Sequence, residues 1–165
     1  MAPFCLERAA SCSVDRLWST ITNFADYGQW LPLTRMTQDE GEPGVGWSFA
    51  GWSGIGPLGF LDPMTIDRWQ PPDSGGVGEF SVTKRGRVLA GWAQVVVRPG
   101  VDPQHSHLEW TEEIRLRPHR LGVRLAPVLD PVNRAMFARA VDAMVAAAEL
   151  VATAERRSGA GAAQQ

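Results

Sequence analysis

Glu112 is the residue of this sequence whose type and surroundings most favour chemistry. Alternation of apolar and polar residues predicts a β-strand over 107–117. Its apolar face carries Leu108, Trp110, Glu112, Ile114 and Leu116. A carboxyl group among apolar side chains has a raised pKa unless it is paired, so Glu112 is a candidate general acid or base, or an anchor for a ligand hydroxyl. Two structural alternatives stay open: Arg68 or Arg87 pairs with the carboxylate, or a bulge exposes it.

Large aromatic side chains recur around this strand. Tryptophans in predicted strands could line a pocket for a flat aromatic or polycyclic ligand, because each offers wide apolar contact and one indole donor. The candidate ligand-binding residues are Trp47, Phe49, Trp52, Phe60, Trp69, Phe80, Trp92, Trp110, Phe137, Val141 and Met144. The alternative is that these side chains fill the interior, and packing alone should account for about half of the tryptophans or more.

Other residue patterns give weaker support for chemistry. His105 and His107 have the spacing of a chelating pair, but no third ligand matches it, so we expect surface histidines and no metal site. The serines lack a nearby histidine and acid, and nothing indicates a cofactor. Lys84, Arg85 and Arg87 lie at a predicted hairpin, where they could steer an acidic ligand or simply remain solvated.

The composition is that of one ordinary globular domain. The chain has 165 residues, 44% hydrophobic and 21% charged, without the polar bias of disorder or the apolar runs of membrane spans. Sixteen basic and eighteen acidic residues give a formal charge of −2, so we expect no general attraction to nucleic acid or anionic lipid and no stable membrane insertion. The start of the chain is unlike a secretory signal, and Cys5 and Cys12 form no metal-ligand pattern, which favours reduced thiols in a cytoplasm.

A strand and two helices are predicted near the amino terminus. Residues 4–10 alternate weakly, as a strand does, and Ser13 occupies an N-cap position before a helix. Apolar residues at spacings of three and four give that helix one buried face. A second short helix is expected from Asn23 to Trp30, ended by the proline at 32.

Glycine and proline then punctuate a series of short strands. We predict strands at about 34–40, 45–52, 63–70, 77–85, 87–98 and 107–117, as in an antiparallel meander. The glycine-rich and proline-rich segment from Gly51 to Pro63 is expected to be a mobile apolar loop or a lid.

One long amphipathic helix is predicted at the carboxyl end. Asp130 and Pro131 supply its N-cap and first residue, and an apolar stripe continues to about Arg157. Residues 119–127 are expected to form a connector, and residues 158–165 a disordered tail.

The order of these elements resembles the START-like (SRPBCC) superfamily, which includes polyketide cyclases/dehydrases, lipid-transport proteins and Bet v 1-like proteins. The matching segments are Ser13–Trp18, Phe24–Tyr27, Trp30–Pro32, Asp67–Pro72, Gly91–Trp92 and Leu108–Glu112. The resemblance implies an α+β helix-grip domain over residues 1–157. In this fold a curved antiparallel sheet of six or seven strands wraps around a long carboxy-terminal helix.

Three functions are compatible with this fold. The first is binding or transport of a small hydrophobic or aromatic ligand, lipid-like or polyketide-like, in an internal cavity. The second is a polyketide cyclase or dehydratase in which Glu112 moves a proton. The third is a regulator that binds a protein partner. The sequence does not decide between a monomer and a homodimer.

Overall fold

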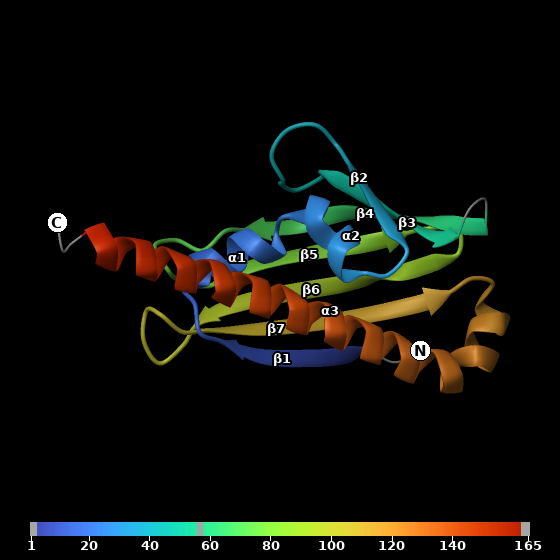
Figure 1. Ribbon diagram of the computed structural model, residues 1–165. Helices are drawn as coiled ribbons and strands as arrows, with labels where there is room; N and C mark the ends of the chain where they lie inside the picture. Colours follow the sequence, from blue (N-terminus) through green and yellow to red (C-terminus); the bar gives the residue numbers. More distant parts are fainter. Residues whose placement is uncertain (1–2, 56–57, 163–165) are drawn as a thin grey trace.

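One curved antiparallel sheet forms most of the molecule (Figure 1). The computed structural model describes residues 3–55 and 58–162. In this part of the chain the sheet has seven strands in the order β1-β7-β6-β5-β4-β3-β2. The strands are β1 Phe4–Ala10, β2 Thr34–Gln38, β3 Ser48–Ile55, β4 Leu58–Gln70, β5 Gly78–Arg85, β6 Leu89–Pro99 and β7 Ser106–Leu116. β1 and β2 are the sheet edges, so the sheet stays open and leaves a concave face to be covered.

Short helices after β1 cover one part of the concave face. α1 spans Val14–Ile21, and its predicted N-cap is confirmed because the Ser13 hydroxyl accepts a hydrogen bond from the Arg16 backbone N–H at 3.3 Å. The second predicted helix consists of a 3-10 turn, η1 Phe24–Asp26, and α2 Tyr27–Trp30. Both turns bury aromatic side chains against the sheet.

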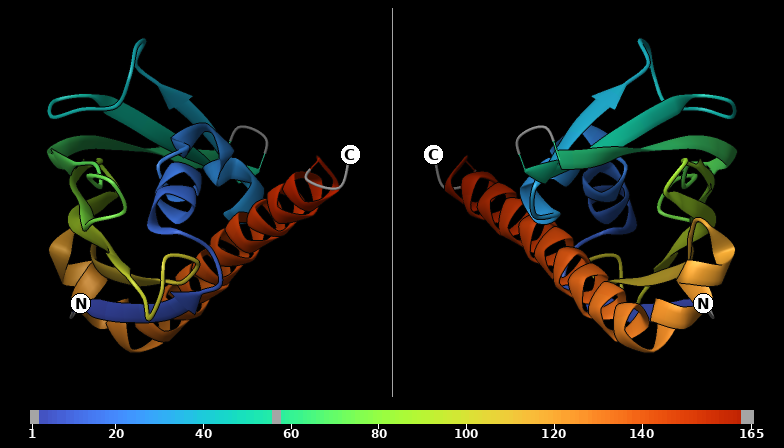
Figure 2. Two further views of the ribbon diagram at one scale, coloured as in Figure 1. Left: turned by 90° about the vertical axis from the view of Figure 1, so that its left-hand side faces the viewer. Right: turned by 90° about the vertical axis from the view of Figure 1, so that its right-hand side faces the viewer.

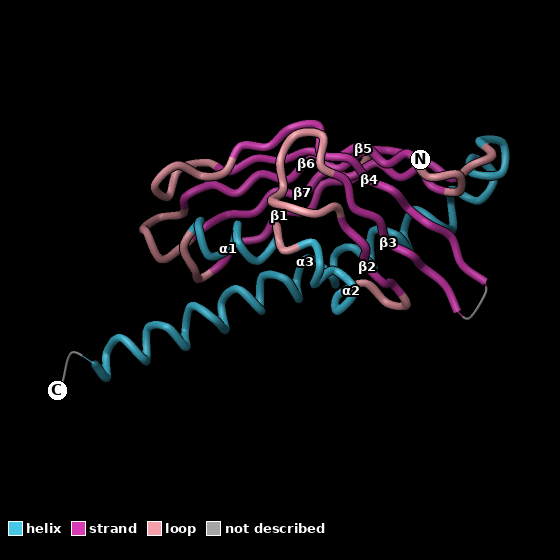
Figure 3. Tube along the Cα trace, turned by 90° about the horizontal axis from the view of Figure 1, so that it is seen from above, coloured by secondary structure: helices cyan, strands magenta, loops and turns pink. Residues whose placement is uncertain are grey.

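The long helix α3, His119–Ala162, crosses the rest of the concave face (Figure 2). It packs against β1, β7 and α1. Its buried side chains are Phe137, Ala140, Val141, Met144, Val145, Ala148 and Ala152. Seen from above, its last turns extend past the sheet (Figure 3). The predicted helix-grip architecture is confirmed.

The limits of α3 differ from the prediction at both ends. The predicted connector is helical, and the helix begins at His119 rather than near Asp130. Pro127 and Pro131 lie inside it, and Figures 1 and 2 show its first turns set at an angle to the long remainder. Proline lacks a backbone donor and crowds the preceding turn, so here it bends the helix instead of starting it. Toward the carboxyl end, the helix continues from 158 to Ala162 where a disordered tail was expected, and residues 163–165 lie outside the described residues.

The predicted lid between Gly51 and Pro63 is also wrong. β3 and β4 run through this segment as a hairpin, paired from Ser48 with Thr65 to Ile55 with Leu58, while residues 56–57 lie outside the described part. Gly54 and Gly59 lie opposite each other, and a Cβ at Gly54 would meet the Gly59 Cα at 2.3 Å. The glycines therefore permit close backbone packing in a hairpin instead of marking a loop.

Candidate functional site

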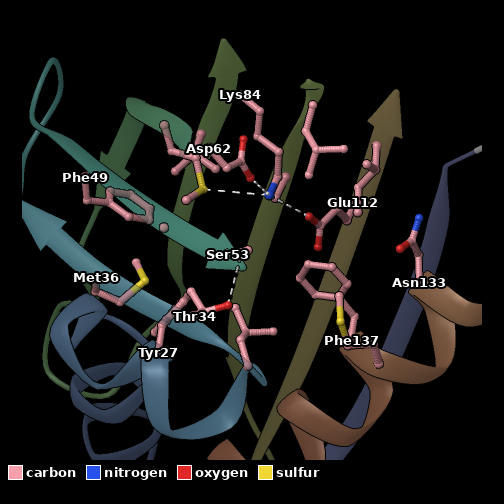
Figure 4. A pocket seen from close by; sticks show the side chains of 18 of the residues that line it. Tyr27, Thr34, Met36, Phe49, Ser53, Asp62, Lys84, Glu112, Asn133 and Phe137 are labelled. Carbon is pink, nitrogen blue, oxygen red and sulfur yellow. Dashed lines mark hydrogen bonds and ion pairs between the residues drawn. The ribbon is translucent and has the colours of Figure 1, made fainter. Parts of the chain in front are cut away.

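A partly open cavity of about 320 Å³ lies between the sheet and the helices (Figure 4). Its lining comes from η1, α2, α3 and every strand except β1, and most of it is apolar. Six of the residues proposed from the sequence line it, namely Phe49, Phe60, Phe80, Trp110, Glu112 and Phe137. The curved sheet brings them together from four strands and α3, although they are distant in sequence.

The other six candidate residues lie outside the cavity lining. Trp47, Trp69, Val141 and Met144 pack in the hydrophobic core instead. For example, the Trp69 ring lies 5.2 Å from that of Trp18, because a register shift between Ile66 and Arg68 in β4 restores its inward direction. These four side chains follow the packing alternative.

Trp52 and Trp92 lie on the outer face of the sheet. Alternation in β3 turns Phe49, Gly51 and Ser53 toward the cavity, which places Trp52 against the backbone of Gly59 on the opposite face. Trp92 donates from its indole nitrogen to Glu113 at 2.8 Å. Neither residue is part of the cavity lining. Trp52 and Trp92 were selected because they are tryptophans. The side of the sheet on which a residue lies, however, depends on its position in the alternation along the strand.

Glu112 is buried in the cavity wall, with 1% of its surface exposed. Its cation partner is Lys84, whose Nζ lies 3.0 Å from Glu112 Oε1 and 3.2 Å from Asp62 Oδ2. The indole nitrogen of Trp110 donates to Glu112 Oε2 at 3.0 Å. The expected partner Arg68 instead faces Glu79, at 3.2 Å. We call Asp62, Lys84 and Glu112 the ion cluster.

Two members of the ion cluster were missed in the sequence. Lys84 continues the inward series of β5 after Phe80 and Val82, so alternation in that strand was a sufficient signal. Asp62 lay in the segment interpreted as a lid, and no alternation was assigned to it. Once β4 begins at Leu58, Phe60, Asp62 and Met64 fall on the cavity face.

The charges of the ion cluster affect one another's pKa values. Burial raises the pKa of Glu112 above its ordinary value of 4.5, although the Lys84 ammonium opposes this. Burial alone would lower the pKa of Lys84, but attraction to Glu112 and Asp62 outweighs it and the pKa is raised. Lys84 therefore holds its proton firmly, and Glu112 accepts a proton more readily than an exposed glutamate does.

Two carboxylate oxygens of the ion cluster have unused hydrogen-bonding capacity. Asp62 Oδ1 and Glu112 Oε1 are buried without a partner in hydrogen-bonding geometry among the described residues, and Lys84 is close to Oε1 without being aligned with it. The nearby Tyr27 hydroxyl donates to the Ile21 carbonyl at 2.6 Å, and burial followed by the Glu112 charge raises its pKa. The cluster thus places carboxylates with unused hydrogen-bonding capacity in the wall of a mostly apolar cavity.

Comparison with known proteins relates this arrangement to solved structures. No family model and no curated protein matches the sequence. Among solved structures, TTHA0849 from Thermus thermophilus matches with a TM-score of 0.70 at 10% identity, over 92% of this chain and 99% of that one. The ZhuI aromatase/cyclase from Streptomyces sp. R1128 matches with a TM-score of 0.61 at 14% identity, over 90% and 93%. A norcoclaurine synthase from Thalictrum flavum matches with a TM-score of 0.57 at 14% identity, over 87% and 93%.

The protein has the helix-grip fold of START-like and Bet v 1-like proteins. At these identities the likeness establishes the fold alone, so the function of this helix-grip protein must be argued from its own cavity.

Other kinds of site find little support in this helix-grip protein. Within residues 3–55 and 58–162, no group of three or more His, Cys, Asp and Glu side chains is arranged to hold a metal ion. His105 is exposed and pairs with Asp102 at 2.8 Å. No helix of the described chain combines the length and hydropathy needed to cross a membrane.

Proposed function

We propose that this protein binds a small hydrophobic or aromatic molecule in its cavity, with one hydroxyl group of the ligand held by the ion cluster. The observation that carries the proposal is the combination of a mostly apolar lining with buried oxygens of Asp62 and Glu112 that accept no hydrogen bond within the described part of the chain. A cavity that served packing alone would have no use for such oxygens, because buried polar atoms without partners are costly.

The volume of the cavity limits the ligand to a small one. Engineered cavities of roughly 150 Å³ take up benzene, and ligand pockets range from about 300 to 1,000 Å³. A volume of about 320 Å³ therefore fits one or two fused rings or a short branched chain. Phe49, Phe80 and Trp110 supply aromatic surface for such a ligand.

The charges of the ion cluster select the polar group. Two carboxylates and one ammonium leave an excess negative charge when all three are ionised, so a ligand carboxylate would be repelled. A hydroxyl group can donate to Glu112 Oε1 or Asp62 Oδ1. It can also accept from a protonated Glu112, and the raised pKa favours that form.

Isothermal titration with 2-naphthol, naphthalene and 2-naphthoic acid tests the proposal. We expect 2-naphthol to bind most tightly, naphthalene more weakly and 2-naphthoic acid weakest. Ala93→Phe fills the cavity from β6 and should abolish binding. Ala50→Phe places the same side chain on the outer face of β3 and serves as the matched control. Equal binding by Ala93→Phe, in a variant with unchanged circular dichroism, would refute a cavity site.

A second candidate is a cyclase or dehydratase that acts on a polyketide-like substrate. It is favoured by the position of Glu112, a buried acid with a raised pKa in the wall of an apolar cavity. In this role Glu112 would take a proton from a carbon next to a ketone and return it to the leaving hydroxyl. Glu112→Gln should then abolish turnover of a poly-β-keto thioester while 2-naphthol still binds. Undiminished turnover by this variant would exclude Glu112 as the acid.

A further inference from the structure

The basic residues of the chain are concentrated at one end of the molecule. We define the arginine-rich end as residues 58–61, 85–89 and 117–134, which meet on the right of Figure 1 and face the viewer in the right panel of Figure 2. Its charged residues are Arg85, Arg87, Arg117, Arg120, Arg124, Arg134 and Asp130, a net charge of +5. The rest of the chain has ten basic and seventeen acidic residues, a net charge of −7. The total of −2 therefore conceals a strongly polarised molecule.

The six arginines of this end are free to meet an external anion. All six are exposed, and none forms an ion pair with another residue in the described part of the chain. Six of the ten basic residues elsewhere do form ion pairs, namely Arg8, Arg16, Arg68, Lys84, Arg98 and Arg115. This contrast matters because an arginine that already pairs with an acidic residue of its own chain is less available to bind an anionic partner.

Exposed aliphatic side chains lie among these arginines. Six of the twelve exposed large hydrophobic residues of the described chain belong to this end, namely Leu58, Leu61, Val123, Leu125, Val128 and Val132. Leu58 is 81% exposed and Val128 is 66% exposed. Helices that lie at a lipid interface combine such apolar side chains with Lys and Arg.

The arginine-rich end also borders the cavity. Phe60, Leu89 and Leu129 belong to its three segments, are only partly buried and line the cavity. The backbone joins two of the segments, because the Arg117 N–H donates to the Val88 carbonyl at 2.8 Å. A molecule that enters or leaves between these side chains passes the arginine-rich end.

We infer that the arginine-rich end is a peripheral docking surface for an anionic lipid bilayer. The arginines meet lipid phosphates and carboxylates, and the exposed leucines and valines enter the headgroup region. We favour a bilayer over an acidic protein because six exposed aliphatic side chains, from two separate segments, accompany the arginines, and such side chains can enter the headgroup region of a bilayer. The protein can dock on a bilayer without a bound ligand. The role that we assign to docking is exchange of an apolar ligand between the bilayer and the cavity, and this role rests on the proposed function.

Vesicle co-sedimentation tests the inference with the full-length protein. The vesicles contain phosphatidylcholine alone or with about one third phosphatidylserine. We expect binding to the anionic vesicles, little to the neutral ones, and a decrease as salt screens the charges. Arg120→Gln/Arg124→Gln should weaken binding roughly 30-fold, since each basic residue near an anionic surface contributes about fivefold. Arg139→Gln/Arg157→Gln, which removes the same charge from sites farther along the same helix, is the matched control and should bind normally.

A second pair of variants separates a bilayer from an acidic protein. Val128→Ser/Val132→Ser should weaken vesicle binding without changing the net charge, since both side chains are exposed and unimportant for the core. Binding of polyglutamate as tight as binding of anionic vesicles, or no effect of the serine variant, would overturn the bilayer assignment and indicate an acidic protein partner. Equal loss in both arginine variants would also overturn it. Failure of 2-naphthol to bind would refute the proposed function and leave vesicle binding as an independent result.

Discussion

Burying the ion cluster costs the protein free energy of folding. This cost is the reason to assign the cluster a functional role. A buried ion pair gains little over well-packed apolar residues of the same size, because charges lose hydration when they leave water. Lys84 and Glu112 are both nearly fully buried, and they line an apolar cavity instead of joining two elements at the surface. Functional sites are where such perturbed groups accumulate.

Glu112 and its neighbour Glu113 should affect stability in opposite ways as pH changes. Burial raises the pKa of Glu112, so its contribution to the free energy of unfolding is most favourable below 4.5 and is lost as pH rises through the folded pKa. Hydrogen bonds from Arg115, and then from Trp92, lower the pKa of Glu113, so its contribution is present above 4.5 and is lost as pH falls. Urea denaturation between pH 3 and 8 measures both effects.

The two glutamine variants make this a matched experiment. Glu112→Gln should gain stability relative to the wild type as pH rises above 4.5, whereas Glu113→Gln should lose stability relative to the wild type as pH rises toward 4.5 from below and then stay level. The residues are adjacent in β7 and face opposite sides of the sheet. Parallel pH profiles for the two variants would contradict the assignment of Glu112 to the buried face.

Lys84→Met should be severely destabilising, because it leaves the buried carboxylates of Asp62 and Glu112 without a cation. Removing one partner of a buried pair costs about 3–5 kcal/mol in free energy of unfolding. The neutral triple variant Asp62→Asn/Lys84→Met/Glu112→Gln should recover most of this loss, since no charge stays buried. Urea denaturation at pH 7 gives both values. A loss below about 1 kcal/mol for Lys84→Met would mean that water reaches the cluster.

At the scale of the elements, the β3–β4 hairpin depends on two glycines. A Cβ at Gly59 would meet the Trp52 ring at 2.3 Å. We therefore expect Gly59→Ala to cost about 1–3 kcal/mol in free energy of unfolding, as overpacking usually does. Gly44→Ala is the control, because its Cβ would meet no atom within 4 Å. Equal stability of the two variants, measured by urea denaturation, would show that the hairpin adjusts without cost.

The strand that carries Glu112, and the apolar face on which Glu112 lies, could be predicted from the sequence because alternation in β7 is long and regular. The β3–β4 hairpin could not, since its glycines and Pro63 are the residues that usually indicate loops. Their role depends on a partner strand that the local sequence does not reveal. The same limit explains why Lys84 was assigned to a solvated hairpin. Its partners Asp62 and Glu112 lie 22 and 28 positions away in sequence.

At the scale of the whole molecule, α3 closes an open sheet. β1 and β2 are not paired with each other, so the apolar face between them is covered by α1, α2 and α3. The same helix supplies Phe137 to the cavity and three arginines to the arginine-rich end. The proposed ligand binding, the proposed bilayer docking and the folding of the domain are thus linked through one element. Its final turns extend past the sheet (Figure 3).

Removal of residues 158–165 should leave the domain folded, because the sequence predicts that the domain ends at residue 157. Among the side chains of α3 that the structure describes, the last buried one is Ala152, and the last tertiary contacts are the ion pair of Arg16 with Glu155 and the hydrogen bond from Arg156 to Gln104. All of these precede residue 158. We expect the free energy of unfolding, measured by urea denaturation, to change by less than about 0.5 kcal/mol.

A longer truncation is the contrast. Removing residues 145–165 deletes Val145, Ala148 and Ala152 from the core together with the contact to α1. This variant should lose cooperative thermal unfolding, because the concave face is no longer covered. A large loss of stability in the shorter truncation would mean that the last turns of α3 have a partner, and a second copy of the chain would then be sought by analytical ultracentrifugation.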